Sequence, residues 1–366
     1  MKRSLGIDFV RAVSILLVMM RHTGFYTGFN YGYYAIEFLF VISGFLIGQI
    51  LFNDFFSTPT IETASVKRFM MRRWFRILPL YYFCILVKFA FVHDIGWNIF
   101  YYIFFLQNHF FGIDFYPVSW TLVIDEWFYL GAPIMIYVFM RFISSKPIHI
   151  LYFLISVIAA INLLRIGWVW YSNTAWGGIT GNVPLRQDTL LIGVLLAFIK
   201  NKYRAVFDWM GQTKIFWTGI VLLIGYVAII YTIRYPEDHV DDYFWTRTIS
   251  FTISSLLVMI TLPWLENSFP VISHPSMKWF NSLIVWGSKL SYALYLTHAE
   301  IIHLLKAPFA YLHIPEWLSK YLYIVVAIGV SFILYKLIEK PMLILRDKYF
   351  PDRPHSKQPV AATQVN

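Results

Sequence analysis

The first apolar stretch of the chain carries Arg11 and His22 where a membrane-spanning helix must run. The charge-free run between them, 12–20, is shorter than the roughly 20 residues that a helix needs to cross about 30 Å of hydrocarbon. The first span must therefore cover about 5–25 and include both polar residues. Arg11 and His22 are close to three turns apart, so we expect them to share one helical face, with Asp8 about one turn below Arg11. A buried cation costs at least about 2.5–3.5 kcal/mol, which favours a binding or proton-transfer site, although a snorkelling arginine and a hydrogen-bonded histidine would also fit.

The composition indicates a membrane protein built of helices. Apolar residues make up 58% of the 366 residues and charged residues 14%, and the mean hydropathy is +0.60, a balance that a soluble domain of this length does not need. The single cysteine, Cys84, excludes an internal disulfide framework. We expect an all-α, polytopic bundle of about ten transmembrane helices, with an interfacial or re-entrant segment over 97–111. The expected spans are 5–25, 33–52, 75–92, 120–140, 148–168, 186–200, 215–233, 245–265, 284–305 and 319–339.

The distribution of Lys and Arg predicts the orientation in the membrane. With both termini in the cytoplasm, twenty of these residues fall in inside segments and five in outside segments, as the positive-inside rule requires. The same bias accounts for the net charge of +10, so a nucleic acid partner is unnecessary. We expect one membrane domain over 1–345 and a cytoplasmic, disordered tail over 346–366, where the sequence is polar and contains proline.

Polar residues also lie near the outer ends of the second and fourth spans. Glu37 is a charge in the second span, and Ser43 and Gly44 form a small patch that suits close helix packing better than a ligand. Asp125 and Glu126 begin the fourth span. Adjacent helical residues point about 100° apart, so at most one of these two should face a given cavity. A solvated helix start would explain both carboxylates, but the aromatic residues around them favour burial.

The sixth and ninth spans add three further polar residues. Arg186 and Asp188 start the sixth span, where a close ion pair would limit the cost of burial, either as a structural clasp or as part of an acceptor pocket. His298 lies late in the ninth span, where a lone histidine is more often a packing residue than a catalyst. The sequence has no spacing typical of a metal site, a phosphate-binding P-loop or a nucleophile elbow.

A cluster of basic residues precedes the third span on the cytoplasmic side. Arg72 and Arg76 are four residues apart, and Arg73 and Arg76 are three apart, so each pair shares a helix face. Guanidinium groups match phosphate oxygens with two parallel hydrogen bonds. Attraction to anionic lipid explains basic loops in general, but three arginines so close together favour a phosphate-bearing ligand.

Together these residues resemble the signature motifs of the family-three membrane acyltransferases over about 5–345. The matching segments are Asp8 to Arg11 followed by His22, Phe38 to Ile47, Arg72 to Tyr81, Trp120 to Tyr129, Arg186 to Gly193, Leu290 to His298 and Tyr335 to Pro341. The chain departs from the family at Glu37, where Asp is common, and at Thr121 and Asp125, which take the positions of Ser and Glu. Each motif alone is weak evidence for the resemblance, but together, in this order and topology, the motifs are strong evidence.

The resemblance implies an enzyme of the bacterial cytoplasmic membrane that modifies cell-envelope polysaccharide. Such a protein moves an acyl group, commonly acetyl, from cytosolic acyl-coenzyme A to a hydroxyl of an extracytoplasmic glycan or lipid-linked sugar. Acetyl-CoA is then the donor substrate, no metal is needed, and the acceptor and membrane lipid are the partners. Intramembrane Arg and His also suit a proton-coupled transporter or exporter, but such a carrier should show internal symmetry or paired broken spans.

The implied chemistry gives each candidate residue a role. His22 would be the base that takes the acceptor's proton, with Glu126 or Asp125 orienting its ring, because Arg11 lies about 16 Å away at three turns. Arg11 would hold the donor thioester. Three cytoplasmic arginines would clasp the phosphates of the coenzyme: Arg72, Arg73 and Arg76. The remaining candidates would shape the acceptor side or support the structure: Asp8, Glu37, Ser43, Arg186, Asp188 and His298. Ser43 or His22 would carry any covalent acyl intermediate, but direct transfer is the expectation, since no nucleophile–base pair is evident.

Overall fold

A computed structural model describes most of the chain. It covers residues 3–25, 30–56, 63–92, 95–110, 115–234, 238–271, 274 and 277–351. The greater part of the expected tail, 352–366, lies outside these residues.

Helices account for all the regular secondary structure of the described residues, and ten of the helices are long. Each of the ten expected spans falls on one of them: α1 (Leu5–His22), α2 (Tyr31–Phe56), α3 (Thr63–Phe91), α6 (Trp120–Val138), α7 (Pro147–Ser172), α9 (Val183–Lys202), α11 (Thr213–Arg234), α13 (Ser250–Asn267), α14 (Lys278–Tyr311) and α15 (Glu316–Leu334). Among the described residues, six stretches of helix are long and apolar enough to cross a membrane: Tyr31–Phe55, Thr63–Phe91, Pro117–Ile143, Pro147–Ser172, Thr213–Arg234 and Glu316–Tyr349. The structure therefore supports a helical protein with several spans, while ten spans remains a prediction.

Shorter helices connect the long ones. They are α4 (Ile99–Ile103), α5 (Gln107–Phe110), α8 (Trp176–Thr180), α10 (Arg204–Met210), α12 (Phe244–Arg247) and α16 (Lys340–Tyr349). Two 3₁₀ turns lie at Gly96–Asn98 and Pro117–Ser119, and two π-helical turns at Phe139–Ile143 and Tyr335–Glu339. The aromatic stretch expected at the membrane interface is thus folded into α4 and α5, which a short connection separates.

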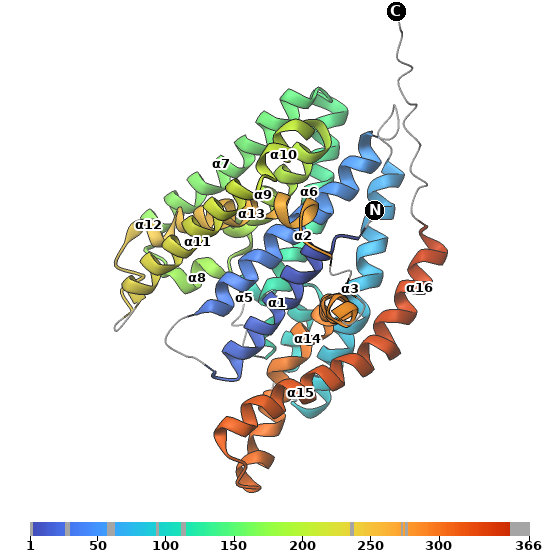
Figure 1. The fold of residues 1–366 in the computed structure, drawn as a ribbon, viewed down its shortest axis with the longest axis vertical. Coiled ribbons are helices and arrows are strands. Elements are labelled where there is room, and N and C mark those ends of the chain that lie inside the picture. Colours follow the sequence, from blue (N-terminus) through green and yellow to red (C-terminus); the bar gives the residue numbers. More distant parts are fainter. Residues whose placement is uncertain are drawn as a thin grey trace, which may run out of the picture.

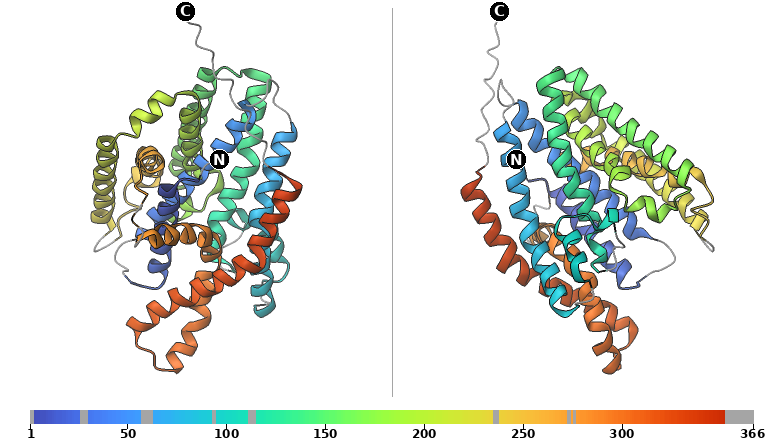
Figure 2. Two further views of the ribbon diagram at one scale, coloured as in Figure 1. Left: turned by 45° about the vertical axis from the view of Figure 1, so that its right-hand side comes forward. Right: turned by 180° about the vertical axis from the view of Figure 1, so that it is seen from behind.

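Two of the helices that carry charged residues lie in the interior of the bundle. α1 contains Asp8, Arg11 and Arg21, and α9 contains two charged residues, Arg186 and Asp188, that are 0% exposed. Around them, α7 and α15 turn large apolar side chains outward. In Figures 1 and 2, α1 and α2 run between a group formed by α7, α11 and α13 and a group formed by α3, α15 and α16. This arrangement keeps ionised groups against protein and leaves apolar faces for lipid.

Glycines allow α2 and α9 to pack with their backbones in contact. A Cβ on Gly44 would overlap the carbonyl oxygen of Leu190, and one on Gly193 would overlap that of Val41. Gly48 also packs closely on the next turn of α9, where an added Cβ would lie 2.7 Å from the Ala197 Cβ. The Ser43–Gly44 patch therefore serves helix packing through Gly44, as expected. Small residues are the usual means by which membrane helices approach this closely.

The end of the described chain differs from the expected disordered tail. Residues 346–349 form the last turn of α16, which packs along α3. Arg72 of α3 forms an ion pair with Asp347 at 3.2 Å, and the Phe75 and Phe350 rings lie 5.6 Å apart. The segment is polar in sequence, but these partners on α3 order it.

The glycine contact leads to a stability prediction. Replacing Gly44 with Ala should lower the melting temperature in detergent, because the added methyl meets backbone that cannot move aside; overpacking of this kind costs about 1–3 kcal/mol. Gly225→Ala in α11 is the matched control, since its Cβ would meet nothing within 4 Å. That control should be neutral or slightly stabilising, because Ala favours helix over Gly by about 0.5–1 kcal/mol. Equal melting temperatures for the two variants would contradict the packing.

Candidate functional site

An elongated cavity of about 280 Å³ runs between α1, α2, α3, α6 and α14. Ile36 and Ile50 of α2 both line it. They are 14 residues apart, so the cavity follows this helix for about 21 Å at about 1.5 Å per residue. We call the part near Arg11, Arg73 and Arg76 the arginine end and the part near Thr121 and Tyr295 the tyrosine end.

The arginine end holds three cations that have no carboxylate partner among the described residues. Arg11 donates a hydrogen bond to the Ser291 hydroxyl at 3.0 Å. The Arg73 guanidinium lies 5.4 Å from the centre of the Tyr129 ring. Unpaired guanidinium groups inside a membrane protein are costly, so this end is suited to an anionic ligand.

A second cavity, of about 350 Å³, adjoins the arginine end. It shares Arg11, Leu46 and Arg76 with the first cavity and continues toward Arg3 and Glu339. Asp8, one turn before Arg11, also lines it; its carboxylate accepts hydrogen bonds from Arg3 and, at 2.6 Å, from Ser288. The two cavities are thus neighbours, with Arg11, Leu46 and Arg76 lining both of them.

Arg72 does not join the other two arginines of its cluster. Consecutive residues of a helix point about 100° apart, and Arg72 turns to α16, where it contacts Asp347 and the Phe350 carbonyl oxygen. Arg73 and Arg76 line the cavity. The expected three-arginine clasp is therefore reduced to two members from α3, with Arg11 of α1 nearby.

One carboxylate of the Asp125–Glu126 pair lines the cavity, in keeping with their adjacent helical positions. Asp125 is a lining residue, whereas Glu126 is 7% exposed and is not among the lining residues. The Ser43 hydroxyl, on the opposite wall, lies 2.7 Å from the Tyr129 hydroxyl. Within the described part of the chain, neither carboxylate hydrogen bonds to His22, so the structure does not bring together the expected carboxylate–histidine pair.

His22 instead lies beside His298, beyond the tyrosine end of the cavity. The two ring centres are 4.9 Å apart with an interplanar angle of 70°. His298 is 0% exposed, and its Nδ1 lies 3.0 Å from the Leu294 carbonyl oxygen and 2.8 Å from that of Tyr295. Tyr295 connects this pair to the cavity: its hydroxyl lies 2.8 Å from Thr121 Oγ1, and its ring centre is 5.9 Å from that of His298.

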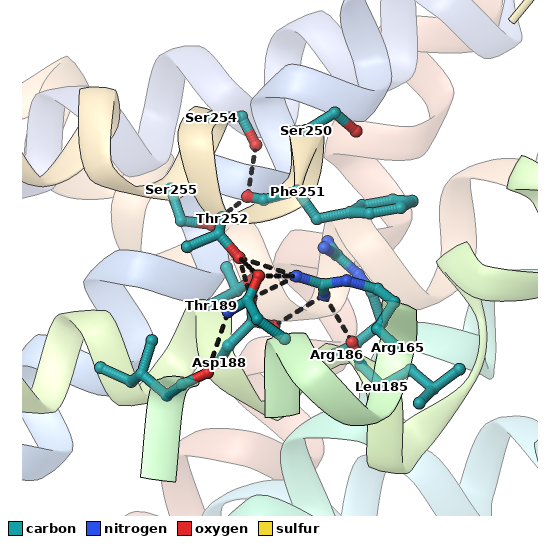
Figure 3. Close-up of polar contacts among 12 residues, drawn as sticks. Arg165, Leu185, Arg186, Asp188, Thr189, Ser250, Phe251, Thr252, Ser254 and Ser255 are labelled. Atoms are coloured by element: carbon teal, nitrogen blue, oxygen red, sulfur yellow. Dashed lines mark hydrogen bonds and ion pairs between the residues drawn. The ribbon is translucent and has the colours of Figure 1, made fainter. Parts of the chain in front are cut away.

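The charged residues at the start of α9 form two buried ion pairs with other helices, and Figure 3 shows the pair of Asp188 with Arg165. Arg186 binds Glu37 of α2, and Asp188 binds Arg165 of α7 at 2.9 Å. All four side chains are 0% exposed, and Thr252 of α13 donates a hydrogen bond to Asp188. A guanidinium–aromatic contact adds to them, since Arg186 lies 4.3 Å from the centre of the Phe251 ring.

Arg186 and Asp188 do not pair with each other, contrary to the expectation from the sequence. Residues two apart on a helix point about 200° apart, so each side chain finds a partner on a different neighbouring helix. Sequence reasoning missed Arg165, which stands alone in an apolar stretch and is 23 positions from its partner. Because neither pair lines the two cavities, the structure places these residues in a clasp that joins α2, α7, α9 and α13.

Comparison with known proteins identifies the family. A family model described as an acyltransferase domain matches residues 4–336. The chain belongs to acyltransferase family 3. Within the described residues, no group of His, Cys, Asp and Glu side chains is placed to hold a metal ion.

Curated relatives from Staphylococcus aureus match almost the whole chain. "Putative O-acetyltransferase SACOL0978" of strain COL is 26% identical over 92% of this chain and 56% of its own length. "O-acetyltransferase OatA" of strain MRSA252 is 24% identical over 98% of this chain and 60% of its own length. The chain thus spans somewhat more than half the length of the curated relatives it matches. No solved structure is significantly similar to it.

The clasp leads to a second stability prediction. Asp188→Asn should lower the melting temperature strongly, because it leaves the buried Arg165 without a counter-charge, a loss of about 3–5 kcal/mol. The control is Asp208→Asn, which removes an exposed pair with Arg204 worth about 1 kcal/mol or less. Thermal unfolding of the purified variants in detergent measures both. A small and equal effect of the two substitutions would contradict a structural role for the clasp.

Proposed function

We propose that this member of acyltransferase family 3 is a transmembrane O-acyltransferase. It moves an acyl group, commonly acetyl, from cytosolic acyl-coenzyme A to a hydroxyl of an extracytoplasmic glycan or glycolipid. The family and the names of the relatives support O-acetylation. The single observation that carries the donor assignment is the cavity that joins three unpaired arginines to the neighbourhood of two histidines.

The proposal places all ten long helices across a bacterial cytoplasmic membrane, with both termini in the cytoplasm. The excess of Lys and Arg in the segments between alternate helices supports this topology. α1 and α9 carry charged residues, but these side chains face protein. A criterion based on hydropathy and the number of charges therefore underestimates the ability of these two helices to cross the membrane.

The two cavities suit the shape of a coenzyme A thioester. Its phosphates would meet Arg11, Arg73 and Arg76, since guanidinium groups form paired hydrogen bonds with phosphate oxygens. Its pantetheine arm would extend along the apolar wall of α2 toward Thr121 and Tyr295. The acyl carbonyl would then arrive beside the histidine pair, where an acceptor can reach it from the outer surface.

His22 is the proposed general base. It takes the proton of the acceptor hydroxyl as that oxygen attacks the thioester carbonyl carbon; the carbon–sulfur bond then breaks, and the coenzyme leaves as its thiol after receiving a proton. A base within hydrogen-bond reach contributes about 10²–10⁴-fold to such a step. His22 suits this role because it ends α1 and is exposed beside the buried His298.

Donor binding tests the arginine end. Acetyl-CoA at 100 times its dissociation constant should stabilise the purified protein by about 2.7 kcal/mol, seen as a higher melting temperature. Arg73→Gln should reduce this ligand-induced shift, because it removes a guanidinium that lines the cavity. Arg72→Gln, whose side chain faces α16, is the matched control and should keep the shift. If acetyl-CoA does not shift the wild-type protein at any concentration, a carrier without acyl chemistry becomes the better interpretation.

Acyl transfer tests the proposed base. His22→Ala should lower the ester-linked acetate on surface glycans of an expressing deletion strain by at least about 100-fold, since no base remains for the hydroxyl. The melting temperature and its shift by acetyl-CoA should stay close to wild type, because His22 does not line the donor cavities. Acetate release by mild alkali measures the product. Activity within a few-fold of wild type would remove His22 from the mechanism.

A further inference from the structure

We infer that His298 is the positioning residue for His22: its Nε2 accepts a hydrogen bond from the His22 imidazole and so fixes which nitrogen of His22 faces the acceptor. The inference rests on the proposed function and adds a residue to it. The expected orienting group was a carboxylate, and the structure offers a buried neutral histidine instead.

The surroundings of His298 determine its tautomer. Its Nδ1 lies within hydrogen-bonding distance of two backbone carbonyl oxygens, those of Leu294 and Tyr295. Carbonyl oxygens only accept hydrogen bonds, so Nδ1 must carry the proton. In the neutral ring, Nε2 then holds a lone pair and can only accept.

That lone pair has no protein partner. Nε2 of His298 is buried and makes no hydrogen bond among the described residues. Buried polar atoms are nearly always paired, so each exception calls for an explanation. The ring that faces His298 is His22, whose imidazole also makes no hydrogen bond within the described chain. One hydrogen bond from a His22 N–H to His298 Nε2 would satisfy both rings.

The bond would give His22 the geometry of a general base. One of its nitrogens would donate to His298, so the other would hold its lone pair toward the outer surface, where the acceptor hydroxyl arrives. A neutral partner suits this position because a carboxylate with 0% exposure would need its own counter-charge. A charged ring would be costly at the fully buried His298, so the proton taken from the acceptor stays on the more exposed His22.

Two substitutions distinguish the roles of the two ring nitrogens of His298. Asn places its amide nitrogen where Nδ1 lies, so His298→Asn keeps a donor for the Leu294 and Tyr295 carbonyls but removes the acceptor at Nε2. Gln reaches the position of Nε2 and restores an acceptor there. We expect His298→Asn to lower kcat about 100-fold, with an unchanged KM for acetyl-CoA and a melting temperature near wild type. His298→Gln should stay within about tenfold of wild type. The assay is thiol release from acetyl-CoA by purified protein in detergent, with hexose oligosaccharides as acceptor.

A double variant tests whether His298 acts through His22. The kcat of His22→Ala with His298→Asn should equal that of His22→Ala alone, because a positioning residue has no effect once its target is gone. A further loss in the double variant, or equal inactivity of the Gln and Asn variants, would show that His298 takes the proton itself and would overturn the inference. Full activity of His298→Asn would also overturn it. Failure of the proposed function is a different result, in which the wild-type protein itself releases no thiol.

Discussion

The direct backbone contact between α2 and α9 determines where the rest of the site lies. Gly44, Gly48 and Gly193 remove the side chains that would hold the two helices apart. Polar contacts then join both ends of the pair: Glu37 binds Arg186, and twelve residues further along α2 Gln49 accepts a hydrogen bond from Lys200 at 3.0 Å. The two helices therefore run parallel in a single register, because a shift by one turn would break both polar contacts and bring Cβ atoms against backbone.

The fixed position of α2 also shapes the cavity that ends at Thr121 and Tyr295. One face of this helix packs on α9, and the other lines the cavity from Ile36 through Ser43 to Ile50. α1, α3, α6 and α14 supply the opposite walls and so bring together arginines that are distant in sequence. A rigid wall of this kind suits catalysis, since a reacting carbonyl must be held close to its base for the rate to gain from proximity.

Helical geometry allowed much of the fold to be predicted, but not the partners of its charges. Apolar length located all ten long helices, and the 100° step correctly indicated that only one of Asp125 and Glu126 would line a given cavity. The pairing of Arg186 with Glu37 could not be predicted from the sequence around either residue, because it depends on which helices become neighbours in the fold. The same is true of Arg72, which found a partner beyond the last predicted span. A signal for His298 did exist: like His22, it lies late in a span that the distribution of Lys and Arg predicts to run outward, which would place both at similar depth.

The charges of this chain fall into two classes with different thermodynamic roles. Arg165 and Arg186 are buried with carboxylate partners, so their charges are balanced within the protein and contribute to holding helices together. Arg11, Arg73 and Arg76 form no such ion pair among the described residues, although Asp125 and Glu339 also line the cavities that these arginines share. Under the proposed function, the anionic donor would supply the counter-charge at this site. The histidine pair needs no counter-charge at rest, since both rings can be neutral, and charge develops there only while a proton is being moved. In the proposed mechanism, the permanent charges that bind the donor are therefore separated from the transient charge of proton transfer, so that both steps can take place in one low-dielectric interior.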